Sequence, residues 1–170
     1  MSIRSAIMAD VKLNVDQWNK FAEAVAISTD PKRIDEAKSN ALRQMAAAYL
    51  RMAKTQTPTG ERGTVEVNGK EYHIQTEHMR RSWEAGKLER GARAYQMAVT
   101  NSASYASFVN DGHRQTPGRF VPILGKRLVA NFVEGQHMAE KAQAYTESKA
   151  GGIIRRQTAG LLKGLKNGGK

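Results

Sequence analysis

The sequence predicts an α+β fold in which a small antiparallel β-sheet packs against one long α-helix. Three patterns predict it. Apolar residues recur at helical spacing between Pro31 and Thr57. Apolar and polar residues alternate from Ala94 to Asn101, as in a strand that buries one face. The dipeptide Asn68-Gly69 favours the tight turn of a β-hairpin, and helical patterns return towards the C-terminus.

The N-terminal part contains a predicted strand and two predicted helices. Met8 to Val15 alternates as a short strand. Apolar residues then follow at the spacing of a short amphipathic helix: Trp18, Phe21, Ala22 and Val25. Asp30-Pro31 starts the long helix, because Asp30 can accept from free backbone N–H groups and Pro31 fits the first turn. Pro58 cannot continue a helix, so this one is expected to end near Thr57.

The long helix carries one inward-facing apolar stripe. Its members are Ile34, Ala37, Ala41, Met45, Ala48 and Met52, with Leu42 and Tyr49 beside them. Ala46 to Ala48 add a small-residue face that suits close packing against a sheet or against another subunit. Both interpretations stay open at this point.

The segment 61–76 is predicted to be an inserted hairpin. With Asn68-Gly69 as the turn, the residues on its apolar face are Val65, Val67, Tyr72 and Ile74. Glu66 and Glu71 are opposite each other on the other face, a mildly unfavourable pair of like charges. An isolated hairpin is marginal in water, so its apolar face needs a cover. We interpret it as a subunit interface that docks on a neighbour; a hairpin folded back on its own domain is the alternative.

After the strand 94–101, Asn101 or Ser102 is expected to cap a short helix that ends at Gly112. This helix is predicted to bury Tyr105, Phe108 and Val109. Another short helix is predicted to press Met79 and Trp83 onto the core, because they are four residues apart. A polar loop from His113 to Gly118 and a helical pattern from Leu124 to Val133 are predicted next.

The C-terminal part is predicted to form two helices separated by a glycine hinge. The first runs from about Gln136 to Lys149, and Gly151-Gly152 is the hinge. The last helix has a basic face and an apolar stripe: Ile154, Thr158, Leu161, Leu162 and Leu165. We therefore expect one α+β domain over 1–149 and a basic helical extension over 150–170, with Leu161 and Leu165 at a subunit interface.

The amino-acid composition favours some partners and excludes some kinds of site. The 170 residues contain 27 Lys and Arg against 16 Asp and Glu, a net charge of +11, which favours nucleic acid or an acidic protein as partner. The chain has no cysteine, which excludes disulfides and thiolate metal sites. No apolar run is long enough for a membrane span, and the start does not resemble a secretory signal.

Motifs of enzymes and cofactor sites are not found. A metal site at His137 and Glu140 has little support, because no second pair of ligands accompanies them. The sequence lacks a nucleophile elbow and a phosphate-binding P-loop. We therefore expect no catalytic residues, no cofactor and no metal, and we predict that the protein is not an enzyme.

Three motifs in a fixed order carry a family resemblance. They are Thr57 to Gly60 (TPTG), His78 to Trp83 (HMRRSW) and Asn101 to Arg114 (NSASYASFVNDGHR). Together they resemble the tail-completion (head–tail joining, or neck) family of long-tailed bacteriophages. The residues that match the last motif, or are expected in the core beside it, are Trp83, Asn101, Tyr105, Ala106, Phe108, Val109, Gly112, His113 and Arg114. Two departures are the missing Asp before Thr59-Gly60 and the hairpin inserted after it.

The resemblance implies a fold and a function. The fold would be similar to that of tail-terminator domains. The protein would be a structural virion component, made in the bacterial cytoplasm, that forms a ring of 6 or 12 copies at the neck. Its partners would be further copies of itself, the connector or adaptor of the DNA-filled head, and tail-terminator or tail-tube proteins, with DNA passing through the lumen. No membrane partner is expected.

A basic nucleic-acid-binding protein is the alternative from another class. The net charge and the C-terminal segment favour it, because Lys149, Arg155, Arg156, Lys163 and Lys166 follow the last acidic residue, Glu147. No helix-turn-helix, zinc finger or base-stacking signature accompanies this charge.

Overall fold

A computed structural model describes residues 7–14, 30–59, 64–67, 70–73, 77–121 and 125–167 of the chain. Its elements are, in order, β1 (Ile7–Asn14), α2 (Pro31–Gln56), β2 (Thr64–Val67), β3 (Lys70–His73), α3 (His78–Arg81), β4 (Trp83–Arg90), β5 (Ala94–Asn101), α4 (Ala106–Asp111), β6 (Gly112–Arg114), β7 (Phe120–Val121), β8 (Lys126–Arg127), β9 (Phe132–Glu134) and α5 (Met138–Asn167). The predicted helix around Trp18 and Phe21 lies outside the described residues.

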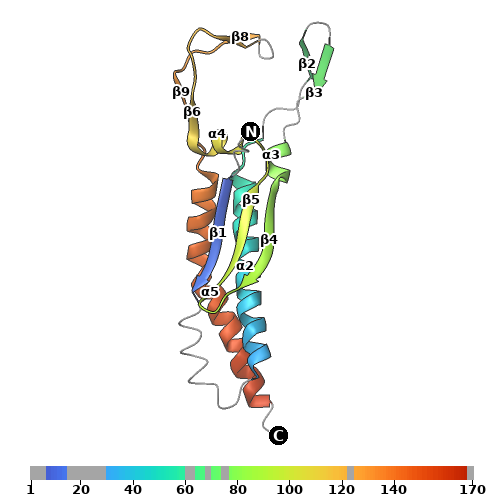
Figure 1. Ribbon diagram of the computed structural model, residues 1–170, viewed down its shortest axis with the longest axis vertical. Coiled ribbons are helices and arrows are strands. Elements are labelled where there is room, and N and C mark those ends of the chain that lie inside the picture. The colour runs from blue at the N-terminus through green and yellow to red at the C-terminus, as the bar shows by residue number, and fades with distance from the viewer. Residues whose placement is uncertain are drawn as a thin grey trace.

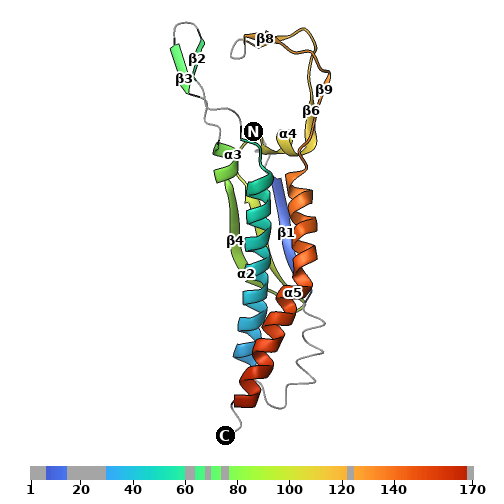
Figure 2. The ribbon, with the colours of Figure 1, turned by 180° about the vertical axis from the view of Figure 1, so that it is seen from behind.

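An antiparallel sheet of strand order β1-β5-β4 forms one layer, and the long helices α2 and α5 form the other (Figure 1). Seen from behind, both helices lie over the same face of the sheet (Figure 2). The central strand β5 buries Tyr95, Met97 and Val99 beneath the helices, as its alternation predicts. The α+β class, with a small antiparallel sheet against a long helix, is therefore confirmed.

Helix α2 begins and ends where the sequence predicts. The Asp30 carboxylate accepts a hydrogen bond of 3.0 Å from the Lys32 amide, and Pro31 is the first helical residue. Thr57 closes the other end, donating its amide to the Ala53 carbonyl oxygen. The buried face is broader than the predicted stripe, because the sheet and α5 cover the helix from two sides. Tyr49 is fully buried, whereas Ala48 and Met52 are half-buried.

Strand β4 is absent from the sequence prediction. The short helix α3 ends at Arg81, so Trp83 begins a strand and does not continue the helix of Met79. Both side chains are nevertheless buried, as expected. The register of β4 against β5 shifts between Ala85 and Leu88, which marks a β-bulge. This irregularity interrupts the alternation by which a strand is recognised.

The predicted break at Gly151-Gly152 is wrong, because α5 continues through both glycines as one helix of 30 residues. Glycine in a helix costs about 1 kcal/mol relative to alanine. The buried side chains of Ile153 and Leu161 beyond the glycines oppose this cost, since they belong to the same apolar core as α2. Leu161 therefore packs inside its own chain, contrary to its predicted place at a subunit interface. Of Leu165 only the backbone is described.

The predicted polar loop after Gly112 and the predicted helix from Leu124 to Val133 are also wrong. Strand β6 pairs with β9, and β7 pairs with β8. Between these pairs, backbone hydrogen bonds join Gln115 to Asn131 and Gly118 to Leu128. The described parts of residues 112–134 thus form one long two-stranded arm, called the ribbon below. Non-local pairing overrides a local helical spacing here.

Two glycines allow the two backbone segments to approach closely at the base of the ribbon. Gly112 has a φ of 82°, and a Cβ atom there would lie 2.5 Å from the Val133 carbonyl oxygen. A Cβ atom on Gly135 would lie 2.2 Å from the Asn110 carbonyl oxygen. Side chains at these positions would therefore collide with backbone. Gly112 also ends α4, as predicted.

The hairpin forms in the predicted register. Val67 pairs with Lys70, Val65 with Tyr72, and Glu66 with Glu71. Ile74 lies outside the described residues. The hairpin and the ribbon project from the same end of the molecule on opposite sides, and the last turns of α5 lie at the other end (Figure 1).

Candidate assembly interface

The three sequence motifs meet at one buried junction between α2 and the sheet. The indole Nε1 of Trp83 donates a hydrogen bond of 2.8 Å to Thr57 Oγ1, which in turn donates to the Ala53 carbonyl oxygen at 2.7 Å. The Trp83 ring meets Tyr49 edge-on, with centroids 6.3 Å apart. The Arg80 guanidinium donates to the Thr57 carbonyl oxygen at 3.2 Å. The first two motifs therefore tie the end of α2 to the start of β4.

Asn101 adds the third motif to this junction. Its side chain is fully buried, and its Nδ2 donates to the Met79 carbonyl oxygen at 2.8 Å. Its Oδ1 accepts from the Ala103 amide at 3.0 Å, in the turn before α4. Asn101 thus does not cap α4 directly, since that cap is Tyr105 without a side-chain bond. It joins α3 to the turn before α4 at the end of the sheet, so this junction is a structural site.

The short helix α4 buries a different face from the predicted one. Tyr105 is 41% exposed and Phe108 is 54% exposed, so their predicted burial is wrong, and Val109 is half-buried. The buried residues are Ala106 and Asn110. Since Asn110 must bond to the start of α5, the helix is turned so that small and polar side chains face inward. The aromatic side chains consequently face outward.

Asn110 organises the start of α5, which the sequence does not reveal. Its Oδ1 accepts from the Ala139 amide at 3.0 Å, and its backbone carbonyl accepts from the His137 amide at 3.0 Å. Its Nδ2 lies 3.2 Å from both carboxylate oxygens of Glu140. These bonds satisfy N–H groups that a helix start leaves free. Residue His137 adopts a φ of 51°, which fixes the corner between ribbon and helix.

The predicted motif residues His113 and Arg114 form the first part of the ribbon. The His113 ring lies edge-on to Phe108, with centroids 5.9 Å apart, and its Nε2 is 3.3 Å from the side-chain Nε2 of Gln115. Arg114 is exposed. His113 therefore anchors the ribbon base against α4, and Arg114 faces solvent.

Among the described residues, most of the large exposed apolar side chains lie on the ribbon or at its base, and Leu162 on α5 is the exception. Those on the ribbon or at its base are Tyr105, Phe108, Phe120, Val129, Phe132 and Val133. Val129 is 92% exposed. An apolar surface concentrated on a projecting element is typical of a protein–protein contact. The ribbon is thus the better candidate interface, although the sequence pattern predicts a loop and a helix there.

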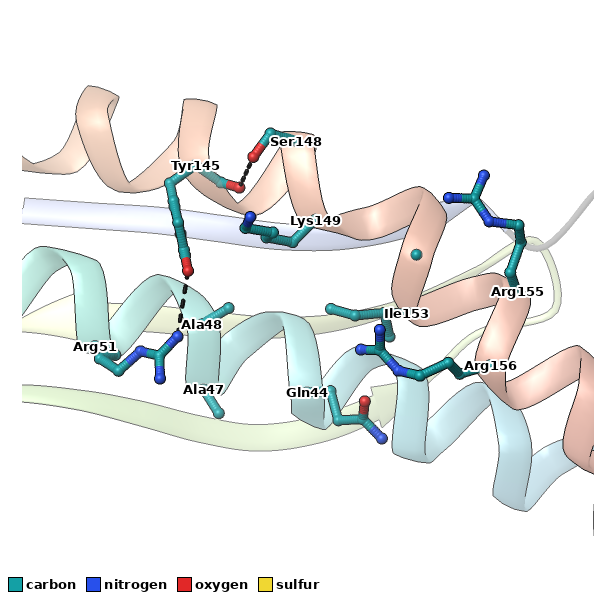
Figure 3. A pocket seen from close by; sticks show the side chains of 11 residues that line it. Gln44, Ala47, Ala48, Arg51, Tyr145, Ser148, Lys149, Ile153, Arg155 and Arg156 are labelled. Carbon is teal, nitrogen blue, oxygen red and sulfur yellow. Dashed lines mark hydrogen bonds between the residues drawn. The ribbon is translucent and has the colours of Figure 1, made fainter.

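A basic groove lies between α2 and α5, with a volume of about 690 Å³. Its cationic residues are Arg51, Lys149, Arg155 and Arg156. Arg51 donates to the Tyr145 hydroxyl at 3.2 Å across the groove, and Arg156 reaches from α5 towards α2 (Figure 3). Lys149 lies over the Tyr145 ring. No ion pair with a described carboxylate holds any of these four cations. The groove can therefore attract an anionic partner.

Two buried tyrosines give the fold a dependence on alkaline pH. Burial, and then the charge of Glu140, raise the pKa of Tyr49 to about 12. Burial, and then a hydrogen bond donated to Asp35, raise the pKa of Tyr95 to about 12. The same bond, followed by Arg90, lowers the pKa of Asp35.

The folded-state pKa of each tyrosine lies above its unfolded value of about 10. The protonated tyrosine therefore contributes to the free energy of unfolding in full below pH 10, and this contribution is lost as pH rises towards 12. We expect the melting temperature to fall between pH 10 and 12, measured by circular dichroism. Tyr49→Phe should make this fall smaller. An equally steep fall in the variant would contradict the assignment to Tyr49.

Within the described ranges, no group of three or more His, Asp or Glu side chains is arranged to hold a metal ion. None of the described helices is long and apolar enough to cross a membrane.

The class defined by this geometry is an α+β protein with a helix–sheet body and two projecting β-elements. A family model described as "Bacteriophage HK97-gp10, putative tail-component" matches residues 24–112. The match spans more than half of the chain and includes all three motifs up to Gly112. The chain belongs to this family of phage tail components. No curated protein and no solved structure matches the chain.

Proposed function

We propose that this protein is a structural virion component that forms a ring at the phage neck and joins the DNA-filled head to the tail. The observation that carries the proposal is the family match, whose three motifs form one hydrogen-bonded junction in the fold. Membership in a family of phage tail components supports a structural role in the virion.

The shape of the chain supports assembly with further copies. A ring requires two different surfaces on each subunit, and their contact must close by rotation. The ribbon and the hairpin provide two projecting elements on opposite sides of the body (Figure 1). We propose 6 or 12 copies, with connector or adaptor proteins on one side and tail-terminator or tail-tube proteins on the other.

Loss of the protein should stop joining. Without it we expect filled heads and complete tails to accumulate separately, because each is built on its own pathway, and infectious titre should fall by orders of magnitude. Electron microscopy of lysates would count joined and unjoined particles. The control supplies the full chain in trans, which should restore joining. A deletion strain that yields normal infectious particles would rule out the joining function.

Contact with DNA is the second candidate function, and the basic groove between α2 and α5 favours it. When cations of a protein neutralise phosphates, the binding constant falls as the salt concentration rises. The logarithm of the binding constant decreases with the logarithm of the salt concentration, with a slope of about 0.9 per phosphate contact. We expect Arg155→Ala with Arg156→Ala to weaken binding to duplex DNA and to reduce this slope, measured by fluorescence anisotropy. Arg33→Ala, at an exposed position on α2, is the matched control. Equal affinity of both variants for duplex would remove the groove as a DNA contact.

A further inference from the structure

We propose that the basic groove between α2 and α5 is a docking site for an acidic segment of a neighbouring protein in the virion. The proposal rests on the structural role proposed above, which brings other proteins against this chain, and it names the chemistry of one contact. The segment would place its carboxylates among the four cations of the groove and its small or apolar side chains on the floor between them.

The first argument is the charge of the groove. Its four cations are exposed, and no ion pair with a described carboxylate involves any of them. Arg51 donates instead to the neutral Tyr145 hydroxyl, and Lys149 lies over the ring of the same tyrosine (Figure 3). The guanidinium groups of Arg155 and Arg156 can each bind a carboxylate through two parallel hydrogen bonds. The groove therefore favours a partner that brings carboxylates.

The acidic residues of the two helices do not neutralise this groove. Asp35 and Glu36 lie near the start of α2, and no Asp or Glu follows them in that helix. The acids of α5 are Glu140 and Glu147, whose carboxylates accept hydrogen bonds from side-chain amides. None of these four carboxylates belongs to the described lining of the groove. Its positive charge is thus left for another molecule.

The second argument is the floor of the groove, which consists of small residues. Ala47 and Ala48 line it on α2, and Gly152 lines it on α5. Glycine inside a helix is less favourable than alanine. The packing of the described chain does not require a glycine here, because a Cβ atom on Gly152 would meet only Arg156 Nη1, at an ordinary distance of 3.7 Å. The floor therefore has room for the main chain of a partner.

The third argument is size, which favours a protein segment over duplex DNA. The groove has a volume of about 690 Å³. On α2 its lining runs from Gln44 to Arg51, roughly two helical turns. A specific protein–DNA interface is broader and buries about 1,000–2,500 Å² of protein surface. The two alanines and the buried Ile153 also give the groove apolar atoms, which match a peptide better than a sugar–phosphate backbone.

Binding of a defined acidic peptide tests the site. The probe is a fluorescent peptide of roughly fifteen residues, about four helical turns, in which pairs of glutamates alternate with pairs of alanines. Fluorescence anisotropy measures its affinity for the purified full-length chain at physiological salt. We expect binding that Arg155→Ala with Arg156→Ala weakens about tenfold. The same peptide with glutamine in place of glutamate should lose affinity by about tenfold or more.

Two neighbouring glycines distinguish entry into the groove from general attraction between charges. Gly152→Leu keeps every cation but places a side chain on the floor, so it should weaken peptide binding about tenfold. Gly151→Leu is the matched control, because Gly151 does not line the groove and a Cβ atom there would likewise meet one guanidinium, at 3.8 Å. The control should leave the affinity unchanged. Neither variant should melt below the unchanged chain, since leucine favours a helix more than glycine does.

Assembled particles test the natural occupant. The photo-crosslinking amino acid p-benzoylphenylalanine replaces Gln44, which is exposed at the edge of the groove. Joined particles are irradiated, and mass spectrometry identifies the cross-linked peptide. We expect a segment of a neighbouring protein in which Asp and Glu outnumber Lys and Arg. The same replacement at Arg33, exposed near the start of α2, is the control and should not capture this segment.

The outcomes separate this proposal from the proposed function. Peptide binding that is lost in Gly152→Leu and kept in Gly151→Leu, together with an acidic cross-linked segment, supports the docking site. Absence of peptide binding, or equal binding by both leucine variants, overturns it. Joined particles without a cross-link at Gln44, or with one to a segment lacking excess acid, overturn it as well. Duplex DNA binding that is lost only in Gly152→Leu would assign the groove to DNA instead. Failure of the joining function is seen differently, as normal particles from the deletion strain.

Discussion

Trp83→Ala is expected to lower the free energy of unfolding by about 3–5 kcal/mol, as truncation of a fully packed aromatic side chain does. Trp83 is 1% exposed, stacks edge-on against Tyr49 and is bonded to Thr57 through its indole. Its removal leaves a cavity and a lost partner at the point where α2 meets the sheet. Urea unfolding followed by circular dichroism measures the change.

Phe108→Ala is the matched control for this prediction. The sequence pattern predicts that Phe108 is buried, but this residue is 54% exposed. We therefore expect a loss of less than about 1 kcal/mol in the isolated chain. Equal losses for Phe108→Ala and Trp83→Ala would show that the described exposure of α4 is wrong.

Asn101→Ala is expected to cost about 2–4 kcal/mol, because two buried backbone groups lose their partner at once. These are the Met79 carbonyl oxygen and the Ala103 amide. Asn101→Asp should be no better at neutral pH, since a carboxylate cannot donate to the Met79 carbonyl. Chemical unfolding again gives the free energy.

Asn40→Ala serves as the control for Asn101, because Asn40 is exposed on α2. A surface change of this kind is expected to stay within about 0.5 kcal/mol. A loss below about 1 kcal/mol for Asn101→Ala would contradict the assigned role of the amide at the junction.

The parts of the fold that the sequence predicts have local signals. Asp30-Pro31 and Pro58 mark both ends of α2 through backbone chemistry that needs no distant partner. The alternation of β5 and the Asn68-Gly69 turn are likewise local, so the strand bounds and the hairpin register are both confirmed. Gly112 as the end of α4 belongs to the same group.

The ribbon could not be predicted in this way. Leu128, Val129, Phe132 and Val133 recur at helical spacing, but their segment pairs with the distant strand β6. Spacing alone assumes that apolar residues cover the core of the same chain. Here several of them are exposed, as are Tyr105 and Phe108. The same assumption misplaces Leu161, which is buried in the apolar core of its own chain.

Asn110 shows a second limit of sequence reasoning. A polar residue inside a short helix suggests solvent, yet it is buried because the start of α5 supplies its hydrogen-bond partners. Only the tertiary fold brings those partners to it. The sequence therefore indicates the hairpin and the buried motif junction, but it does not indicate the ribbon.

The unbroken path of α5 through Gly151-Gly152 makes the molecule directional. The helix starts at the foot of the ribbon and runs along α2 to the opposite end (Figure 1). The ribbon and the hairpin lie at one end of the molecule, and helix ends flanked by cations lie at the other end. Copies arranged side by side with the same polarity would make a disc whose two faces differ in chemistry. Such a disc could not be inserted upside down between two different neighbours, so the order of assembly would be encoded in each subunit.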